Sequence, residues 1–484
     1  MFTESEAKSM RGIIDVCGHL PHWRLERSEI AAVLGSGGGA GTRTVASYDE
    51  DPVTLGVAAA RPLLVGRPDA APVESLTFAT TAPVYAEKSG SPLVHAALQL
   101  PASVSTLDAG PGLRGASAAL RAALHSTDRL VAVVAGDVRT GLAGSTDETG
   151  GGDAGSAVLI GDDSAGPLLA EHLGGASATH EFLDRWRAPG ELRMHAWEER
   201  FGQQRYDELA VDAWDRALDS CGLTDGEVVR VAVSSPHARA GAALAKRLGA
   251  AGVELTDRLD RSVGFTGAAH PGLLLADLLE RSAAGDVVAL VSLADGAEVF
   301  LFRRTAAISG GRPVAEQLAA GSPIPYGKYL AWRGVLPTQP PNRPEPARMS
   351  ASAAERRSEW KYGFVGSRDR SSGAVHLPPA RVSYRGQAVD DMEPVPMAPH
   401  RATVATFTVD SLAYSPSPPV VFAVCDFEDG GRLPMELTDV AAADVRIGML
   451  VEMTFRRIGT ADGIANYFWK ARPVPGVPVA GEAD

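Results

Sequence analysis

Apolar strands alternate with amphipathic helices twice along roughly the first 330 residues of this chain. Arg129–Ala135 and Asp286–Ser292 are nearly unbroken apolar runs, which is the pattern of strands buried on both faces of a sheet. Tyr206–Cys221 and Ala238–Leu248 have helical spacing of apolar residues, and each is followed by a glycine. The repeated order predicts an α/β fold whose body consists of two related halves.

The pattern changes after Pro323. Pro337–Pro346 is rich in proline, which is typical of an extended, semi-rigid linker. Beyond Lys361, β-forming runs such as Val420–Phe427 alternate with Gly and Pro turns, which predicts a small all-β barrel or sandwich. The expected boundaries are 1–170 and 171–328 for the two halves, 329–360 for the linker and 361–484 for the all-β domain.

The stretch Ser105–Leu120 has the composition of a strand-to-helix corner. Gly110 and Gly112 permit a tight backbone, and Pro111 between them fixes one φ angle. A corner of this kind lifts one side chain into a pocket, as a nucleophile requires. The side chain presented here is that of Leu113.

Composition restricts the classes of function. The 484 residues are 45% hydrophobic and 22% charged, which suits a chain that buries a sizeable core. The formal net charge of -13 argues against nucleic acid or an anionic membrane as the main partner, because phosphates require clustered Lys and Arg. No apolar run approaches the ~20 residues of a membrane span. The start, Met1–Lys8, lacks a signal-peptide pattern, and three dispersed cysteines (Cys17, Cys221 and Cys425) predict reduced thiols in a cytoplasmic protein.

Six motifs, in order and spacing, resemble the thiolase superfamily, in particular the 3-hydroxy-3-methylglutaryl-CoA (HMG-CoA) synthase and type-III ketoacyl synthase branch. They are Asp49–Asp51, Phe78–Ser89, the corner at Ser105–Leu120, Ala135–Arg139, Gly152–Ala157 and Gly264–Ala269. The resemblance implies a layered αβαβα body of two related halves. It also implies homodimerisation through that body.

The last 125 residues or so resemble the zinc-ribbon and OB-fold domain that accompanies thiolases. The matching motifs are Trp360–Gly363, Gly366–Arg368, His376–Arg381, Phe407–Val409, Asp429–Leu433 and Tyr467–Lys470. In systems with this domain, it contacts the thiolase-type component and helps to shape the path of the acyl-CoA. The resemblance therefore implies a thiolase-type partner subunit and a CoA thioester as ligand.

The chemistry of this family implies a Cys that carries the acyl group, a His and an Asn that activate it, and in HMG-CoA synthases a Glu as general base. Located by their flanking residues, the Cys, His and Asn positions fall on Leu113, Ser234 and Phe265, and the Glu position falls near Thr81. A leucine cannot carry an acyl group, and no Cys lies between Cys17 and Cys221. All four catalytic positions are therefore expected to be substituted.

The four zinc-ligand positions of the ribbon fall on Asp369, Ser372, Ser383 and Gly386. A structural zinc ribbon uses two pairs of thiolates. One carboxylate, two hydroxyls and a glycine do not make a tetrahedral zinc site, so no structural zinc is expected.

Tyr85 and His237 are the polar residues expected to face the altered pocket. A Tyr could serve as acid or base, as in the thiolase-like retro-aldolases that work with OB partners, and a shift of one turn would make His237 the functional imidazole. The alternatives are a half-buried packing tyrosine and a structural or exposed histidine. His270, at a helix start, is expected to be a capping-region residue. Two charged and aromatic segments, Asp184–Arg187 and Trp197–Phe201, have two interpretations. They bind CoA phosphates or a partner, or they form a mixed surface loop.

These observations favour a catalytically degenerate HMG-CoA-synthase-like subunit fused to an OB-fold domain. It would act as scaffold and acyl-CoA-binding component of a multi-subunit thiolase-type acyltransferase complex, with no covalently bound cofactor. The alternative is an active C–C bond-forming or retro-aldol enzyme on acyl-CoA with a Tyr or His mechanism. A third hypothesis is an acyl-CoA carrier or sensor.

Overall fold

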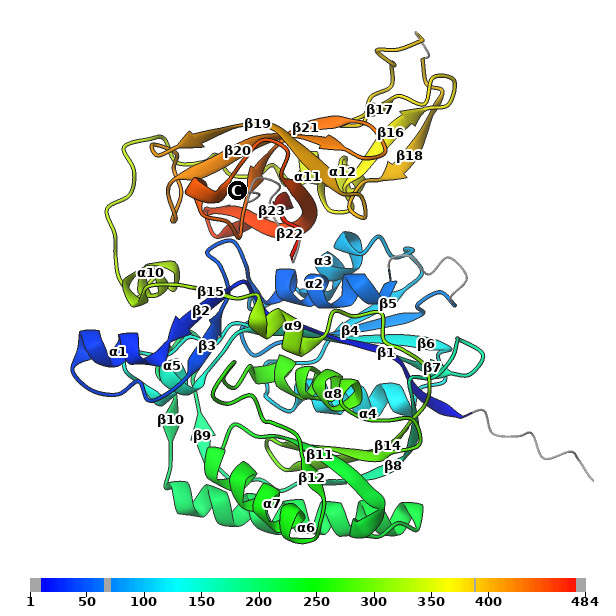
Figure 1. Ribbon diagram of the computed structural model, residues 1–484, viewed down its shortest axis with the longest axis vertical. Helices are drawn as coiled ribbons and strands as arrows, with labels where there is room; N and C mark the ends of the chain where they lie inside the picture. Colours follow the sequence, from blue (N-terminus) through cyan, green and yellow to red (C-terminus); the bar gives the residue numbers. More distant parts are fainter. Residues whose placement is uncertain (1–9, 65–70, 387–388, 476–484) are drawn as a thin grey trace, which may run out of the picture.

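A layered α/β body carries a β-barrel on one side, and the computed structural model describes residues 10–64, 71–386 and 389–475 (Figure 1). The start Met1–Lys8 lies outside the described residues. The strands of the body follow the order β12-β11-β13-β14-β8-β1-β7-β6-β4-β5. Two register pairs join β1 to β8, so the strands make two five-stranded sheets stacked around a shared helical layer (Figure 1).

The N-terminal half forms the sheet nearer the barrel. Its strands are β1 (Arg11–His19), β4 (Ser75–Ala79), β5 (Ser105–Asp108), β6 (Leu130–Asp137) and β7 (Ala154–Asp162). The outer face is covered by α2 (Pro52–Leu64) and α3 (Ser91–Ala97), and the inner face by α4 (Gly115–Leu124) (Figure 1). All eight residues of β6 are buried, as its apolar run predicts.

The C-terminal half repeats this arrangement. Its strands are β8 (Ala170–Ala178), β11 (Val228–Ser234), β12 (Glu254–Leu255), β13 (Val287–Leu293) and β14 (Ala297–Arg304). α8 (His270–Glu280) lies beside α4 in the middle layer, and α6 (Glu199–Cys221) and α7 (Ala238–Ala250) cover the far face (Figure 1). The predicted αβαβα layering of two related halves is confirmed.

Small elements decorate one side of the body. β2 (Trp23–Glu26), β3 (Thr42–Val45) and β15 (Ser322–Pro323) form a small sheet. Around it lie α1 (Arg27–Leu34), α5 (Thr146–Gly150), the hairpin β9 (Arg185–Trp186) and β10 (His195–Ala196), α9 (Val314–Ala319) and α10 (Tyr326–Trp332). α10 crosses the boundary expected at residue 329, and α11 (Ala351–Glu355) and α12 (Ser358–Lys361) occupy the end of the expected linker.

The C-terminal part is all-β, as predicted. Its closed barrel has the order β19-β20-β21-β23-β22, and a three-stranded sheet precedes it. The barrel strands are β19 (Ala402–Asp410), β20 (Val420–Phe427), β21 (Arg432–Leu437), β22 (Leu450–Ala461) and β23 (Ile464–Pro473). The small sheet, which we call the knuckle, consists of β16 (Val365–Asp369), β17 (Val375–His376) and β18 (Met392–Pro396).

The barrel packs on α2, and the two parts share one apolar core. The same cluster of buried side chains runs from Phe78 of the sheet through Val53 and Val57 of α2 to Trp469 of the barrel. The guanidinium of Arg61 lies 4.9 Å from the centroid of the Trp469 ring. The seam between body and barrel is therefore packed like an interior.

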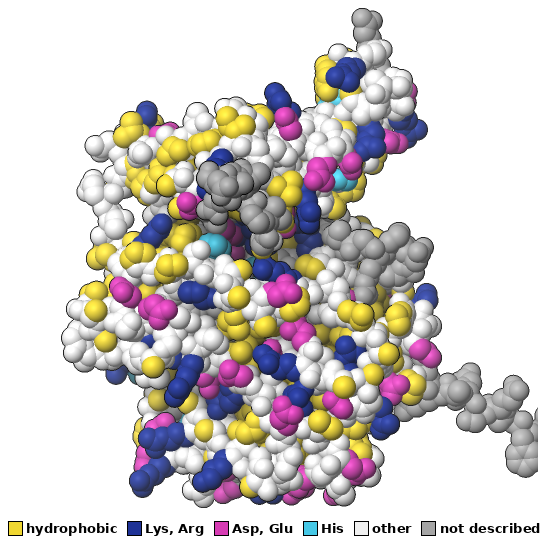
Figure 2. Space-filling model, in the orientation of Figure 1, with side chains coloured by type: hydrophobic (Ala, Val, Ile, Leu, Met, Phe, Trp, Pro, Cys, Tyr) yellow, Lys and Arg dark blue, Asp and Glu magenta, His cyan; other side chains and the backbone are white. Residues whose placement is uncertain are grey.

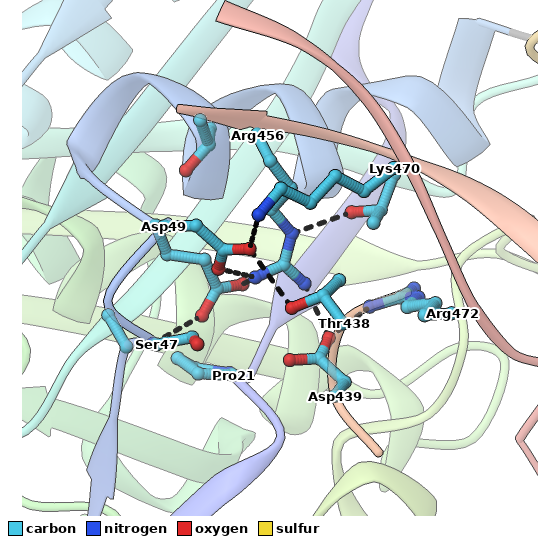
Figure 3. Close-up of polar contacts among 12 residues, drawn as sticks. Pro21, Ser47, Asp49, Thr438, Asp439, Arg456, Lys470 and Arg472 are labelled. Atoms are coloured by element: carbon cyan, nitrogen blue, oxygen red, sulfur yellow. Dashed lines mark hydrogen bonds and ion pairs between the residues drawn. The ribbon is translucent and has the colours of Figure 1, made fainter. Parts of the chain in front are cut away.

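Charged side chains are buried in the same seam (Figure 3). The Arg456 side chain is 1% exposed and contacts three carboxylates: Asp49 at 3.1 Å, Glu50 at 2.9 Å, and Asp439. Lys470 lies 2.9 Å from Asp49. Burial alone would raise the pKa of Asp49, but Lys470 and Arg456 outweigh burial and lower this pKa to about 2.

Removing Arg456 should destabilise the fold strongly. Arg456→Met leaves Asp49, Glu50 and Asp439 buried without their shared cation, and loss of one partner of a buried ion pair costs about 3–5 kcal/mol. Denaturant unfolding of the full chain measures this loss in the free energy of unfolding. The matched control is Arg348→Met, because Arg348 and its partner Asp462 are both exposed. A loss as small as that of the control would contradict the role given to Arg456.

Asp49 should also make the stability of the fold depend on pH under acidic conditions. Its folded-state pKa is below the unfolded value of about 4, so its contribution is present above that value and is lost as the pH falls towards 2. The stability difference between the wild type and Asp49→Asn should shrink by about 2 kcal/mol between pH 4 and pH 2. Unfolding at fixed pH values measures it, with Asp462→Asn as the exposed control. A difference independent of pH would contradict the assignment.

Candidate functional site

A cavity of about 500 Å³ lies on the side of the body, between α5, the start of α7 and the β9–β10 hairpin. This volume is in the range of small-molecule and cofactor sites. Its cationic lining residues are Arg27, Arg139, Arg185 and Arg258, and its acidic ones are Asp147, Asp184, Glu198, Glu199 and Asp260. Both halves of the body contribute, so their packing creates the cavity.

The arginines of one wall are held by a shared carboxylate. Asp147 lies 3.0 Å from Arg185 and 3.7 Å from Arg139. Arg139 also donates a hydrogen bond of 2.9 Å to the hydroxyl of Thr81. The two guanidinium groups are therefore held in place at the wall, and guanidinium groups can bind the oxygens of an anionic ligand with paired hydrogen bonds.

Thr81, the position expected for the general base, is tied to a buried aspartate. Its hydroxyl donates to Asp137 Oδ2 over 2.6 Å, and the backbone N–H of Ala268 donates to the same oxygen over 2.9 Å. Gly267 has a φ of +58°, and a Cβ there would lie 1.9 Å from Asp137 Oδ2. Burial raises the pKa of Asp137, against the opposing effects of Arg139 and Thr81.

Ser234 and Phe265, the residues expected at the positions of the family's His and Asn, meet at a buried histidine. Ser234 Oγ lies 3.0 Å from His270 Nδ1. The ring of Phe265 lines the cavity and packs edge-on against His270, with 4.9 Å between ring centroids. Burial lowers the pKa of His270 to about 3, so its imidazole is neutral. His270 is the first residue of α8, in the capping region as expected, and its side chain pairs with Ser234.

His237 lines the cavity, but both of its ring nitrogens have structural partners. Nδ1 accepts a hydrogen bond from the backbone N–H of Ala240 and caps α7, and Nε2 lies 2.9 Å from the carbonyl oxygen of Glu199. Since Nδ1 accepts, Nε2 carries the proton in the neutral ring. The ring therefore joins the start of α6 to the start of α7.

Tyr85 and Leu113 lie elsewhere. The Tyr85 hydroxyl accepts a hydrogen bond of 2.9 Å from the backbone N–H of Ala465, so Tyr85 faces the barrel. Leu113 is half-buried in the turn before α4 and is absent from the lining of the cavity. The structure thus places Phe265, His237 and Arg139 at the cavity, and Tyr85 at the seam.

The cysteines lie away from the cavity. Cys17 and Cys425 are buried, Cys221 ends α6, and none of the three lines the cavity. Burial raises the pKa of Cys17 and of Cys425 to about 12, which disfavours the nucleophilic thiolate.

The knuckle brings together the four residues expected at the zinc-ligand positions. Asp369 accepts hydrogen bonds from the hydroxyls of Ser371 at 2.8 Å and Ser372 at 2.5 Å. The hydroxyls of Ser372 and Ser383 lower the pKa of Asp369. A Cβ at Gly386 would lie 3.5 Å from the same carboxylate. Within the described ranges, no group of three or more His, Cys, Asp or Glu residues is arranged to hold a metal ion.

Part of the cavity lining was predicted from the sequence. Asp184–Arg187 and Trp197–Phe201, considered for CoA phosphates, both contribute residues to the cavity. Arg27 and Arg258 were not predicted, because nothing in their local sequence distinguishes them from surface arginines. Only the packing of the two halves brings them together.

Replacing His237 should separate a structural role from a chemical one. His237→Ala removes the cap of α7 and should lower the free energy of unfolding by about 1 kcal/mol. His237→Asn retains a cap acceptor and should recover most of the loss, as denaturant titration of both variants would show. Equal losses in the two variants would contradict the capping role.

Metal removal should leave the knuckle unchanged. Because hydrogen bonds to Asp369 replace metal ligands, incubation with EDTA should not shift the melting temperature. Asp369→Ala should lower it, since the hydroxyls of Ser371 and Ser372 lose their acceptor. Calorimetry measures both, with Asp390→Ala as the exposed control. An EDTA-dependent loss of stability would contradict the account.

Known proteins resemble the two parts of the chain separately. Residues 395–456 match the family model of the ChsH2 C-terminal OB-fold domain. A DUF35 domain-containing scaffold protein of Methanocaldococcus jannaschii is 29% identical over 119 residues, which are 24% of this chain and 84% of that protein. Hydroxymethylglutaryl-CoA synthase of Methanopyrus kandleri is 28% identical over 352 residues, 67% of this chain and 97% of that protein.

Solved structures share the fold of the body. HMG-CoA synthase complexed with CoA aligns with a TM-score of 0.56 at 18% identity, over 66% of this chain and 89% of that one. A point variant of OleA from Xanthomonas campestris aligns with a TM-score of 0.52 at 18% identity, over 61% of this chain and 98% of that one. Among the helices described, none has the length and apolar character needed to cross a membrane.

Proposed function

We propose that this chain, a thiolase-fold body similar to HMG-CoA synthases joined to an OB-fold domain, binds a CoA thioester without cysteine chemistry. It would serve as a scaffold subunit of a multi-subunit thiolase-type acyltransferase assembly. The observation that carries the proposal is a cavity of ligand size with four arginines in its lining, next to the expected catalytic positions, which unreactive side chains occupy.

Charge and size support a CoA thioester as the ligand. CoA carries several phosphate charges on a long chain, and the cavity offers about 500 Å³ with Arg27, Arg139, Arg185 and Arg258 in its lining. Guanidinium groups bind phosphates with paired hydrogen bonds. A solved HMG-CoA synthase of the same fold is complexed with CoA.

Several contacts argue against acyl transfer through a covalent cysteine. Leu113 has no nucleophilic atom, and Phe265 covers His270 on the side of the cavity. Ser234 is buried, and the neutral His270 is its partner. Phe265 lines the cavity, whereas Ser234 is absent from its lining.

The barrel and one sheet edge support the scaffold role. The DUF35 domain-containing protein that resembles the barrel is described as a scaffold protein. In the body, β5 is the last strand of the sheet nearer the barrel, and its Leu107 is 63% exposed. An exposed edge strand with an apolar side chain is suited to pair with another chain, and we propose that it pairs with a second copy of this one.

The alternative of a Tyr or His mechanism stays a prediction. Tyr85 and His237 each already have hydrogen-bond partners within the fold. We therefore favour the scaffold role over this alternative. The chain is proposed to be cytoplasmic and to bind acyl-CoA non-covalently.

The protein should bind acetyl-CoA without becoming acylated, and one set of measurements can test both points. Purified protein should bind acetyl-CoA saturably by calorimetry, and mass spectrometry should find no acyl adduct. Arg185→Ala should weaken binding about ten-fold or more, because a charge-assisted contact contributes roughly 1.5–3 kcal/mol. Arg216→Ala is the control, since Arg216 lies exposed on α6. A stable acyl-protein would overturn the proposal, and so would equal affinities in the two variants.

The scaffold role predicts a stable complex. The chain should co-purify with a thiolase-type enzyme encoded beside it that retains its catalytic Cys, and acyl transfer should be detected only when that enzyme is present. Acyl transfer by this chain alone would contradict the assignment.

A further inference from the structure

A second cavity of about 500 Å³ lies in the seam between body and barrel. The loop between β1 and β2 contributes His19, the segment at α9 contributes Arg312, and the barrel contributes Asp439 and Arg472. Figure 2 shows Lys, Arg and His side chains along the line where the barrel meets the body. This cavity, which we call the seam cavity, shares no lining residue with the one described above.

Two buried polar atoms on its walls lack partners. His19 is 7% exposed, and its Nε2 has no hydrogen-bond partner among the described residues. Asp439 is 8% exposed; its Oδ2 contacts Arg456, while its Oδ1 has no partner in the described part of the chain (Figure 3). An unmade hydrogen bond of a buried group costs about 1–3 kcal/mol, so two buried polar atoms without partners, on residues that line one cavity, indicate a ligand.

The charges around the seam cavity favour an anion. Burial lowers the pKa of His19 well below its usual value, and Arg472, Arg456, Arg24 and Arg312 lower it further. His19 is therefore neutral, so its imidazole can donate from Nε2 without adding charge. Of the lining residues, Asp439 is the carboxylate, and it already contacts Arg456.

Arg312 is free to turn to a ligand. Its ion pair is with Glu316 of α9, at 3.7 Å between partly exposed side chains, which is a weak interaction. Arg472 is held by Glu452 at 2.8 Å and lies 3.9 Å from Asp439. One arginine is thus fixed by the barrel, and the other can reorient on the body side.

We propose that the seam cavity binds a phosphate group across the two domains, either free phosphate or a phosphate monoester. Arg312 and Arg472 face the anionic oxygens, His19 Nε2 donates to a third oxygen, and Asp439 Oδ1 accepts from a hydroxyl of the ligand. Groups that converge from separate elements match a tetrahedral oxyanion better than a planar carboxylate. Because its contacts come from both domains, the ligand strengthens their association.

The test is calorimetric titration of the full chain with inorganic phosphate and, separately, with glycerol 3-phosphate at constant ionic strength. Wild type should bind at least one of them saturably at one site per chain. Arg312→Gln should weaken binding at least ten-fold and leave the unliganded melting temperature unchanged. Arg348→Gln, at an exposed arginine on the surface, should bind as the wild type does.

The outcomes separate this site from the acyl-CoA cavity. Tighter binding of the monoester identifies an organic phosphate as the ligand, and tighter binding of inorganic phosphate identifies the free ion. Arg185→Ala should bind phosphate normally, because Arg185 lines the other cavity. The proposal is wrong if neither probe binds saturably, if Arg312→Gln binds like the wild type, or if Arg185→Ala alone abolishes binding.

Discussion

The guanidinium of Arg456, buried among three carboxylates, fixes how the barrel sits on the body. Asp49 and Glu50 come from the segment before α2, and Asp439 comes from the barrel. Apolar packing over α2 has little directionality, whereas each of these ion pairs requires one geometry. The seam cavity exists because this arrangement holds Asp439 and Arg472 opposite the β1–β2 loop.

Much of the fold could be predicted because it follows from local patterns of apolar residues. The buried strand β6 and helix α2 follow from unbroken or periodic apolar residues. β8 is absent from the prediction because its sequence, Ala170–Ala178, contains adjacent glycines and few bulky apolar residues. Its neighbours β14 and β1 define it as a strand. α6 begins at Glu199, seven residues before the expected start at Tyr206, since charged residues hide its first two turns.

The candidate site, like the fold, could be predicted in part: the positions could be located from the sequence, but not their contacts. The sequence predicts substitutions at Leu113, Ser234, Phe265 and Thr81, because flanking motifs locate these positions. Their new partners are not visible: the Ser234–His270 contact spans 36 residues, and the Tyr85–Ala465 contact spans 380. Such pairs form only in the folded chain. The outcome is a body with an arginine-containing cavity in which the ring of Phe265 packs against His270.

A crystal structure of the full chain soaked with acetyl-CoA would test the central claim, that the cavity binds a thioester without acylation. The account predicts an intact thioester in the cavity, with phosphates at its arginines and the acyl end stopped by Phe265. Density for an acyl group on any protein side chain would contradict it. CoA bound away from this cavity would contradict it equally.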